Sequence, residues 1–267
     1  MAILNVTPDS FSDGGALSSD AAAIEFGRAC LRDGASILDV GGESTRPGAE
    51  PIPDAEQVRR TIGAVRALAG EAVVSIDTRS AAVARAALEA GACIVNDVSA
   101  CLDDPAMAPT VAAHDAHLVL MHRMVRPQDD RWSTEQDARR PSGDVVRAVV
   151  DWLGARVDAV VRAGVPRERI AVDPGLGFGK DVRQNLELLA RIGEVASLGL
   201  PVVVGASRKS FLGAVGGVAD PRGRDALSAA AGALAAVQGA AVIRVHDVAR
   251  QRAAIDAAWP GKNAAGS

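Results

Sequence analysis

The chain of 267 residues has very few aromatic side chains: four Phe, three Trp and no Tyr, or 3% in all. A core without many rings has to be filled by Ala, Val, Leu and Ile, and a hydrophobic content of 48% is ordinary for a globular protein. Small and branched side chains of this kind suit helices packed on buried parallel strands. The length of 267 residues is also right for one barrel domain of roughly 250 residues.

Cysteine, excess charge of one sign and long apolar runs are also scarce. Cys30, Cys93 and Cys101 are odd in number and lack metal-ligand spacing, which predicts reduced, mostly buried thiols in a cytoplasmic protein. The net charge of -4 gives no electrostatic reason to expect nucleic acid or an anionic membrane as a partner. No apolar run is long enough for a membrane span, and residues 1–6 lack the features of a signal peptide. We therefore expect a soluble, cytoplasmic protein.

One pattern recurs eight times: a short apolar run, a polar residue at its end, a loop rich in Gly, Ser and Asp, and an Ala-rich segment. The apolar runs are too short for helices and lack strict alternation, so they predict buried parallel strands at Ala2–Val6, Ser36–Asp39, Val73–Asp77, Cys93–Asn96, His117–Met121, Ile170–Asp173, Val202–Gly205 and Ala241–Val245. Apolar residues near the 3.6 period predict helices at Asp20–Asp33, Asp54–Ala69, Ser80–Ala90, Pro105–His114, Gly143–Ala163, Val182–Ile192, Arg224–Gln238 and Asp247–Ala258.

Eight such units without a linker favour an α/β fold, a single (β/α)₈ TIM barrel over residues 1–259, with residues 260–267 as a flexible C-terminal tail. A doubly wound open sheet is the alternative, because the number of units does not prove closure. The charged stretch Arg123–Ser142 is predicted to be a long, mobile loop after the fifth strand.

Polar side chains stand at the ends of these strands, where barrel enzymes place their active sites. They are Asn5, Asp39, Asp77, Asn96, His122, Asp173, Ser207, Arg208, Lys209, Arg244 and His246. So many polar groups converging on one mouth would be costly to desolvate without a ligand. We therefore expect a functional site there.

The polar groups fall into three chemical classes. Positive charge comes from Arg46, Arg208, Lys209, Arg244 and His246, which suits an anionic group such as a phosphate. Asp77, Asn96 and Asp173 suit the ring NH and amino groups of a flat, nitrogen-rich heterocycle. The alternative for each acid is a buried ion pair with a Lys or Arg, for which Lys209 is available. The loops Thr7–Gly15 and Gly41–Gly48, with Phe11, Glu43 and Arg46, have the composition of movable segments that close over a substrate.

Several strings in this order resemble the dihydropteroate synthase family over nearly the whole chain. The two long ones are Ile-Leu-Asn-Val-Thr-Pro-Asp-Ser-Phe-Ser-Asp-Gly-Gly from Ile3 and Asp-Val-Gly-Gly-Glu-Ser-Thr-Arg-Pro-Gly-Ala from Asp39. The others are Ser-Ile-Asp-Thr from Ser75, Asn-Asp-Val from Asn96, Leu-Met-His from Leu120, Asp-Pro-Gly-Leu-Gly-Phe-Gly-Lys from Asp173, Ser-Arg-Lys-Ser from Ser207 and Arg-Val-His-Asp-Val from Arg244. The two long strings are highly specific, whereas the tripeptides alone would carry no weight.

The resemblance implies a transferase of folate biosynthesis that joins 6-hydroxymethyl-7,8-dihydropterin pyrophosphate to p-aminobenzoate and releases pyrophosphate. By motif, Asp77, Asn96, Asp173 and Lys209 would hold the pterin, with Met121 and Gly205 also in the substrate site. Thr45, Arg244 and His246 would hold the pyrophosphate, and Asn5 would help to bind Mg²⁺. Phe11, Arg46, Pro47, Phe178 and Ser210 would shape the aminobenzoate site, and Asp13 would join the closed first loop.

The resemblance also implies a loose displacement in which the C–O bond breaks first. Asp77 and Asp173 would stabilise the pterin cation, and Mg²⁺, Arg46, Arg244 and His246 would stabilise the departing pyrophosphate. The aniline nitrogen needs no strong base, so no Ser, Cys or Lys nucleophile is assigned. His122 is expected to brace a loop. Pyrophosphate is expected to bind before p-aminobenzoate has a pocket.

Two departures from the family pattern stand at the start of the chain. Family members usually carry residues ahead of the first strand, so this chain is expected to be a shortened version of lower stability; Ala2 also replaces a common Gly. The family further suggests a homodimer through outer helices such as Arg224–Gln238. The family is the target of sulfonamides, and whether this chain is a sulfonamide-insensitive form is left open by its sequence.

Three other functions remain open. A pterin-using methyltransferase with a corrinoid partner would share the pterin site but would not need the cationic cluster. A Schiff-base aldolase could use Lys209, with Arg208 lowering the pKa of that lysine. A non-catalytic pterin-binding subunit would be expected to lack the first-loop acids or Lys209, and both are present.

Overall fold

Eight parallel strands alternate with helices along the chain. The computed structural model describes residues 1–6, 19–44, 47–136 and 143–259. Its strands are β1 (Ala2–Asn5), β2 (Ile37–Gly41), β3 (Val73–Asp77), β4 (Ile94–Asp97), β5 (His117–Met121), β6 (Ile170–Asp173), β7 (Val203–Val204) and β8 (Val242–Ile243). Its α-helices are α1 (Ser19–Arg32), α2 (Asp54–Leu68), α3 (Ala81–Glu89), α4 (Met107–Ala113), α5 (Val145–Arg162), α6 (Val182–Ala190), α7 (Ile192–Ala196), α8 (Ser210–Gly216), α9 (Asp225–Val237) and α10 (Val248–Ala258). Short 3₁₀ turns are η1 (Pro127–Asp129), η2 (Arg167–Arg169) and η3 (Arg222–Arg224).

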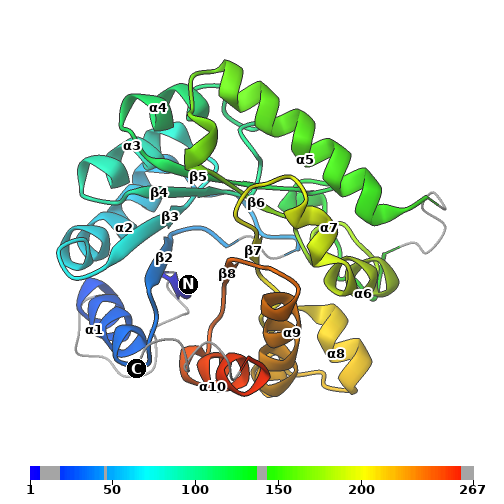
Figure 1. Ribbon diagram of the computed structural model, residues 1–267. Coiled ribbons are helices and arrows are strands. Elements are labelled where there is room, and N and C mark those ends of the chain that lie inside the picture. Colours follow the sequence, from blue (N-terminus) through cyan, green and yellow to red (C-terminus); the bar gives the residue numbers. More distant parts are fainter. Residues whose placement is uncertain (7–18, 45–46, 137–142, 260–267) are drawn as a thin grey trace, which may run out of the picture.

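The strands close into a ring, and the helices lie outside it (Figure 1). Strands β1 to β6 pair in sequence order, and β7 pairs with β8. Two single bridges join these parts: Val172 pairs with Val202, and Ala2 pairs with Val245. The amide of Ile3 donates to the carbonyl of Val245 at 2.9 Å, so the first and eighth strands meet. The (β/α)₈ barrel prediction is therefore confirmed, and the open sheet is excluded.

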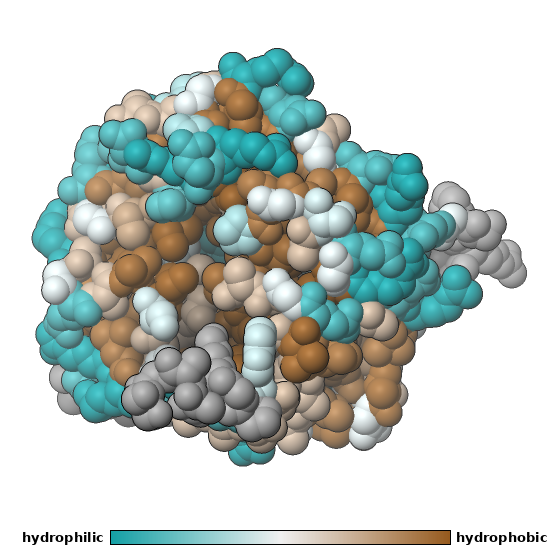
Figure 2. All heavy atoms as spheres, in the orientation of Figure 1, coloured by the Kyte–Doolittle hydropathy of each residue, from teal (hydrophilic) through white to brown (hydrophobic). Residues whose placement is uncertain are grey.

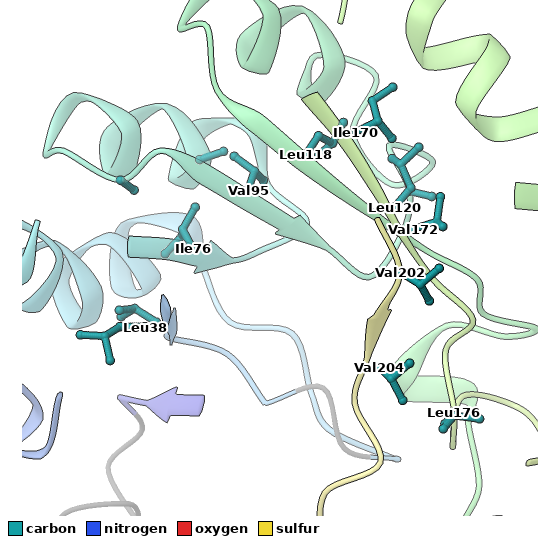
Figure 3. Packing of buried hydrophobic residues seen from close by; sticks show 14 of the residues in the cluster. Leu38, Ile76, Val95, Leu118, Leu120, Ile170, Val172, Leu176, Val202 and Val204 are labelled. Atoms are coloured by element: carbon teal, nitrogen blue, oxygen red, sulfur yellow. The ribbon is translucent and has the colours of Figure 1, made fainter. Parts of the chain in front are cut away.

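The packed core lies between the strands and the helices. The strand register pairs Ile76 with Val95, Val95 with Leu118 and Leu118 with Ile170. These four residues therefore form one continuous row on the outer face of the strands (Figure 3). These side chains are fully or almost fully buried and belong to one cluster with apolar residues of the surrounding helices. Because successive residues of a strand point to opposite faces, the residues between them face the inside of the barrel. The outer face of each strand is thus apolar, and the inner face is free to carry polar groups.

The predicted strands agree closely with the observed ones, but three local predictions need correction. The chain forms two helices beyond the eight predicted ones, α7 after α6 and α8 directly after Lys209. Cys93 is exposed, whereas Cys30 is buried. Of the loop predicted to be mobile, residues 137–142 lie outside the described residues. Residues 123–136 hold buried, hydrogen-bonded side chains such as Asp130 and Ser133 and do not have the character of a mobile loop. Among the described helices, none is both long and apolar enough to cross a membrane.

Candidate active site in the barrel mouth

The inner faces of the strands bring the polar strand ends together. In the strand register, Asn5 pairs with Gly41, Gly41 with Asp77, and Asp77 with Asn96, so these residues lie at one level of the barrel. Asp39 lies one step deeper, paired with Ser75. On the other side of the ring, Met121 pairs with Asp173. The period-2 alternation of short strands, read from the sequence alone, therefore places all of these side chains in one interior.

Arg244 is the electrostatic centre of this interior. Its Nε donates to Asp39 Oδ2 at 2.6 Å, and its Nη2 donates to Asp77 Oδ2 at 2.6 Å. Asn96 Nδ2 donates to the same Asp39 oxygen at 3.0 Å. Burial alone would lower the pKa of Arg244, but Asp39 and Asp77 together raise this pKa above its ordinary value. The alternative reading of Asp77 as one half of a buried ion pair is thus realised, with Arg244 rather than Lys209 as its partner.

Asp77 retains one oxygen that can serve a ligand. Burial raises the pKa of Asp77 to about 7, against the opposing effect of Arg244. Its Oδ1 is buried and has no hydrogen-bond partner among the described residues, and the same holds for Oδ1 of Asp39. Buried acceptors of this kind are rare in folded proteins because each costs roughly 1–3 kcal/mol. Asp77, which is 7% exposed, thus keeps an unused acceptor oxygen beside Arg244, whereas Asp39 is completely buried.

Asp173 and Lys209 form the opposite side of the mouth. Asp173 Oδ1 accepts a hydrogen bond from the amide of Gly175 at 2.7 Å, and burial raises the pKa of Asp173. Lys209 Nζ lies 3.9 Å from the centre of the Phe178 ring, a cation–π contact. Burial, and after it the charge of Arg244, lower the pKa of Lys209 to about 8. Arg208 is not among the causes.

A single pocket joins these groups. Its lining residues are Asn96, Val98, Met121, Asp173, Leu176, Phe178, Gly205, Lys209 and Arg244. Val98, Met121 and Phe178 form a small apolar cluster of their own within this lining. The pocket thus combines apolar walls with a few convergent polar groups, which is the usual character of a small-molecule site. Seven of the predicted site residues therefore share one cavity, namely Asn96, Met121, Asp173, Phe178, Gly205, Lys209 and Arg244.

Arg208 does not belong to this pocket. Its Nε and Nη2 donate to the two carboxylate oxygens of Asp225 at 2.7 and 2.9 Å. Its backbone has a left-handed conformation, with φ of 60°, and its amide donates to Ser228 Oγ at 2.9 Å. The expectation that Arg208 adds positive charge to an anion site is therefore wrong, because its charge is already paired with a carboxylate on α9.

Four more predicted residues fall within the described ranges: His246, Ser210, Asn5 and Pro47. His246 Nδ1 is 2.9 Å from Ser207 Oγ, which also accepts a hydrogen bond from the His246 amide at 3.2 Å. Ser210 Oγ accepts from the amide of Ser133 at 3.1 Å, so it faces the loop after β5. Asn5 Oδ1 lies 3.7 Å from where a Cβ on Gly41 would be, beside Asp77. Pro47 is half-buried. The other four predicted residues, Phe11, Asp13, Thr45 and Arg46, lie outside the described residues.

The base of the second loop is anchored by ion pairs. Glu43 Oε2 accepts from Arg79 Nη2 at 2.9 Å, and Glu43 Oε1 accepts from the amide of Ile52 at 3.2 Å. Arg79 Nη1 also donates to Asp103 at 3.0 Å, and Asp103 in turn pairs with Arg123. Four successive loops of the barrel mouth are thus linked through alternating charges.

Sequence reasoning missed Lys180, a fully buried residue of the mouth, gave Asp39 too small a role and predicted the role of His122. Lys180 was quoted only as part of a motif, yet its Nζ is enclosed and donates to three backbone carbonyls. Asp39 was named as a polar strand end without its role as acceptor for Arg244. His122 packs its ring edge-on against Trp152 at 4.9 Å, and burial lowers its pKa to about 2, which agrees with a bracing role. The signal available in the sequence was a lysine that ends the glycine-rich string Asp173–Lys180.

Comparison with known proteins places this site in a family. The model of the family described as "Pterin binding enzyme" matches residues 1–246. The chain is 44% identical over 251 residues to the dihydropteroate synthase of Streptococcus pyogenes serotype M3, covering 93% of this chain and 90% of that protein. It is 45% identical over 264 residues to a probable bifunctional folylpolyglutamate synthase/dihydropteroate synthase of Haloferax volcanii. In that case the match covers 98% of this chain and only 30% of the longer protein.

Solved structures agree with these relatives. The dihydropteroate synthase of Xanthomonas albilineans with 4-aminobenzoic acid has a TM-score of 0.88 and 40% identity, over 100% of this chain and 92% of that chain. The same enzyme in complex with 7,8-dihydropteroate has a TM-score of 0.85 and 38% identity, over 98% of this chain and 92% of that chain. With this identity, coverage and fold, the chain belongs to the pterin-binding enzymes and, among them, to the dihydropteroate synthase family.

Proposed function

We propose that this protein is a dihydropteroate synthase that condenses 6-hydroxymethyl-7,8-dihydropterin pyrophosphate with p-aminobenzoate and releases pyrophosphate. The observation that carries the proposal is the shared pocket of Asn96, Asp173, Lys209 and Arg244, with Asp77 hydrogen-bonded to Arg244. Carboxylates, an amide and cations that meet in one mouth match a ring with several N–H donors that carries a diphosphate. Family membership points to the same reaction.

The pterin ring would lie against Asp77, Asn96 and Asp173. The free Oδ1 of Asp77 would accept a hydrogen bond from the ring, which relieves an unpaired buried oxygen. Met121 would give an apolar wall, and Gly205 would leave room for the flat ring, since both line the pocket. Lys209 would complete the ring site from the side of Phe178.

The diphosphate would lie towards Arg244 and His246, with Thr45 of the second loop. Two N–H groups of Arg244 are already bonded to carboxylates at 2.6 Å, so only its remaining N–H groups would be available to the leaving diphosphate. When the C–O bond breaks, the positive charge of the pterin lies close to Asp77 and Asp173. Two preoriented buried carboxylates stabilise such a cation without reorganising solvent, which lowers the barrier. The aniline nitrogen then attacks with its own lone pair, so no residue has to act as a strong base.

The p-aminobenzoate would enter last, against Phe178 and Ser210. Phe11, Asp13, Arg46 and Pro47 of the first two loops would close this subsite from above. Binding of the second substrate would therefore follow that of the diphosphate. Binding of p-aminobenzoate to the pterin-free enzyme with undiminished affinity would contradict this order.

A magnesium ion fits the residues in the mouth. Within the described residues, no three acidic, His or Cys side chains gather as a ligand set. Mg²⁺ commonly takes only one or two protein oxygens and completes its shell with water and substrate phosphates. Asn5, with its amide oxygen beside Gly41 and Asp77, provides one hard oxygen donor, and Asp39 and Asp77 each keep an unpaired oxygen nearby. Mg²⁺ held by Asn5 would neutralise the negative charge of the diphosphate.

The test is pyrophosphate release on mixing both substrates. The wild-type protein should release pyrophosphate, whereas Asp77→Ala and Lys209→Ala should lose most of the rate. Arg147→Ala, which removes a solvent-exposed ion pair on α5, is the matched control and should keep full activity. Omission of p-aminobenzoate tests whether release depends on the condensation. Activity that needs a corrinoid partner and releases no pyrophosphate would favour a methyltransferase.

The lowered pKa of Lys209 also suits an amine that forms a Schiff base. Borohydride trapping with a carbonyl substrate separates this function from the proposed one. A Lys209 adduct would support an aldolase, and its absence together with pyrophosphate release would exclude one. An inhibition curve with a sulfonamide at fixed p-aminobenzoate would then establish whether the enzyme is drug-sensitive.

We further propose that residues 1–259 act as one catalytic domain in a homodimer. Helix α9 has one charged residue, Asp225, and exposes Leu234 and Val237 by 45% and 55%. Val215 of the neighbouring helix α8 is exposed as well, and Figure 2 shows apolar surface around α8 and α9. A helix that is apolar all round usually faces a partner. Light scattering should give a dimer for the wild type and a monomer for Leu234→Glu, and a wild-type monomer would contradict this.

The three cysteines are free, as is usual for proteins of a reducing compartment, and we propose that the protein is located in the cytoplasm.

A further inference from the structure

The loop after β6 is unusually tightly enclosed. Gly175, Gly177 and Gly179 alternate along it, all with positive φ of 68°, 82° and 70°. A Cβ on Gly175 would lie 1.8 Å from the carbonyl oxygen of His122, and one on Gly179 would lie 2.7 Å from Cβ of Met124. Two of the three glycines thus press against the start of the loop after β5. The two loops are therefore packed against each other without room for a methyl group.

Asp130, on the loop after β5, holds the loop after β6 by its backbone. The amide of Gly179 donates to Oδ2 and Oδ1 of Asp130 at 3.0 and 3.1 Å. The same carboxylate accepts from the amide of Arg131 and from Gln136 Nε2, each at 2.8 Å. Asp130 is only 7% exposed and has no arginine or lysine within ion-pair distance in the described chain. Because this buried carboxylate accepts hydrogen bonds from the amides of both loops, it holds the two backbone segments together.

Ser133 extends this contact to helix α8. Its amide donates to Oγ of Ser210 at 3.1 Å, and its own Oγ accepts from Asn185 Nδ2 at 3.1 Å. Asn185 Oδ1 accepts in turn from the amide of Gly177 at 2.6 Å. The loop after β5 thus touches Ser210 on one side and, through Asn185, the residue next to Phe178 on the other.

Lys180 fixes the same two loops from inside. Its Nζ donates to the carbonyls of Gly175 at 2.8 Å, and of His122 and Phe178 at 3.3 Å each. Between them, Asp130, Ser133 and Lys180 hold the backbone on both sides of Phe178. The ring of Phe178 in turn carries the ammonium of Lys209 at 3.9 Å.

We infer that Asp130 and Ser133 are positioning residues for the second substrate: they hold Phe178 and Ser210, two walls of the proposed aminobenzoate subsite, at a fixed separation. This inference rests on the proposed function. It assigns to residues 127–136 the task of a rigid back wall against which that substrate is held. Neither residue lines the pocket, so both act through Phe178 and Ser210.

The pterin groups on β3 and β4 do not depend on this contact. Asp77 and Asn96 stand on β3 and β4 and are held by Arg244 and Asp39. No hydrogen bond of Asp130 or Ser133 in the described chain reaches any of these four residues. Loss of the Asp130 carboxylate should therefore move the aminobenzoate walls and leave Asp77 and Asn96 in place.

The carboxylate of Asp130 also acts on the site electrostatically, through the pKa of Lys209. Asp130 is one of three carboxylates, with Asp77 and Asp173, that raise the pKa of Lys209 against the effects of burial and Arg244. Removal of this carboxylate should therefore shift the alkaline limb of the rate profile to lower pH. A purely architectural residue would not produce that shift.

The experiment compares Asp130→Ala with Asp129→Ala, its exposed neighbour, by pyrophosphate release with each substrate varied in turn. Asp130→Ala should raise KM for p-aminobenzoate about tenfold or more, as expected for the loss of hydrogen bonds to a charged group. KM for the pterin pyrophosphate should stay within about twofold, and Asp129→Ala should match the wild type. Asp130→Asn, which keeps one acceptor oxygen, should recover part of the loss in KM.

Ser133→Ala removes one acceptor from a buried site and is the second variant, in case Asp130→Ala does not fold. It should raise KM for p-aminobenzoate by a smaller factor and again spare the pterin. An equal rise in KM for both substrates, or a fall in kcat with neither KM changed, would overturn the inference. A wild-type protein that releases no pyrophosphate would instead refute the proposed function, so the two failures are distinguishable.

Discussion

The buried lysine Lys180 is expected to make the folded protein more stable as the pH rises above 7. Its ammonium is fully enclosed and meets three carbonyl oxygens, with Asp173 and Asp130 as the nearest negative charges and Lys209 as the nearest positive one. Burial lowers its pKa from 10.5 to about 7. Above pH 7 the folded protein therefore releases a proton that the unfolded chain still binds. Stability rises with pH wherever the unfolded state binds more protons, so this contribution increases from pH 7 upwards.

The magnitude follows from the two pKa values. One pKa unit corresponds to about 1.4 kcal/mol, and between pH 7 and 8.5 the folded lysine passes from half to almost fully deprotonated. The unfolded lysine stays charged over this range. The gain is therefore about 1.5 kcal/mol in the free energy of unfolding across this interval. Other groups titrate near this range, so the contribution of Lys180 has to be isolated by comparison with a variant that lacks it.

Urea unfolding at pH 7.0, 7.5, 8.0 and 8.5 (about half-unit steps) measures this slope for the wild type and for Lys180→Met. Lys180→Met should be less stable overall because three carbonyls lose their donor, but its stability should rise less with pH. The difference between the two proteins removes the contributions of Lys209 and Asp77, whose pKa values of about 8 and 7 fall in the same range. Parallel pH curves for the two proteins would refute the reasoning.

Three other predictions concern single groups of the barrel mouth. Asp39→Asn should lower kcat/KM at least about tenfold, because a guanidinium and an amide lose their shared charged acceptor; unchanged pyrophosphate release would contradict this. Gly175→Ala should cost about 3 kcal/mol or more in urea unfolding, whereas Gly217→Ala, with the same left-handed backbone but no atom within 4 Å, should cost only about 1–2 kcal/mol. In a double-mutant cycle by thermal unfolding, Arg208→Ala and Asp225→Ala should show a coupling of about 1 kcal/mol, and strict additivity would exclude their ion pair as a stabilising contact.

The sequence was most informative where structure depends on local pattern. Strand β3 and strand β5 begin and end where the apolar runs of residues 73–77 and 117–121 predict. Their inner positions follow from the same runs, because alternation along a strand is a property of the extended backbone. The assignment of Asp77 to the barrel interior was therefore available before any coordinates.

Side-chain partners were much less accessible. Arg208 and Lys209 are neighbours in the chain and were assigned the same role, yet one pairs with Asp225 and the other lies on Phe178. A left-handed φ of 60° at Arg208 turns the two side chains apart, and the sequence carries no signal for that conformation in a non-glycine residue. Asp130 lay within a charged stretch that resembled a mobile loop. Its burial depends on a contact with the loop after β6, almost 50 residues further along the chain.

Eight short apolar runs, each ended by a polar group and followed by a helix, were sufficient to determine an α/β fold of parallel strands with polar groups at their ends, because strand periodicity and the solvation of polar atoms act over a few residues. The tertiary structure alone decided that β8 meets β1 and that Arg244 reaches Asp39, 205 positions away, and Asp77, 167 positions away. Such partners are selected only when the ring closes, since the energy of a buried charge depends on which opposite charge lies within about 4 Å of it.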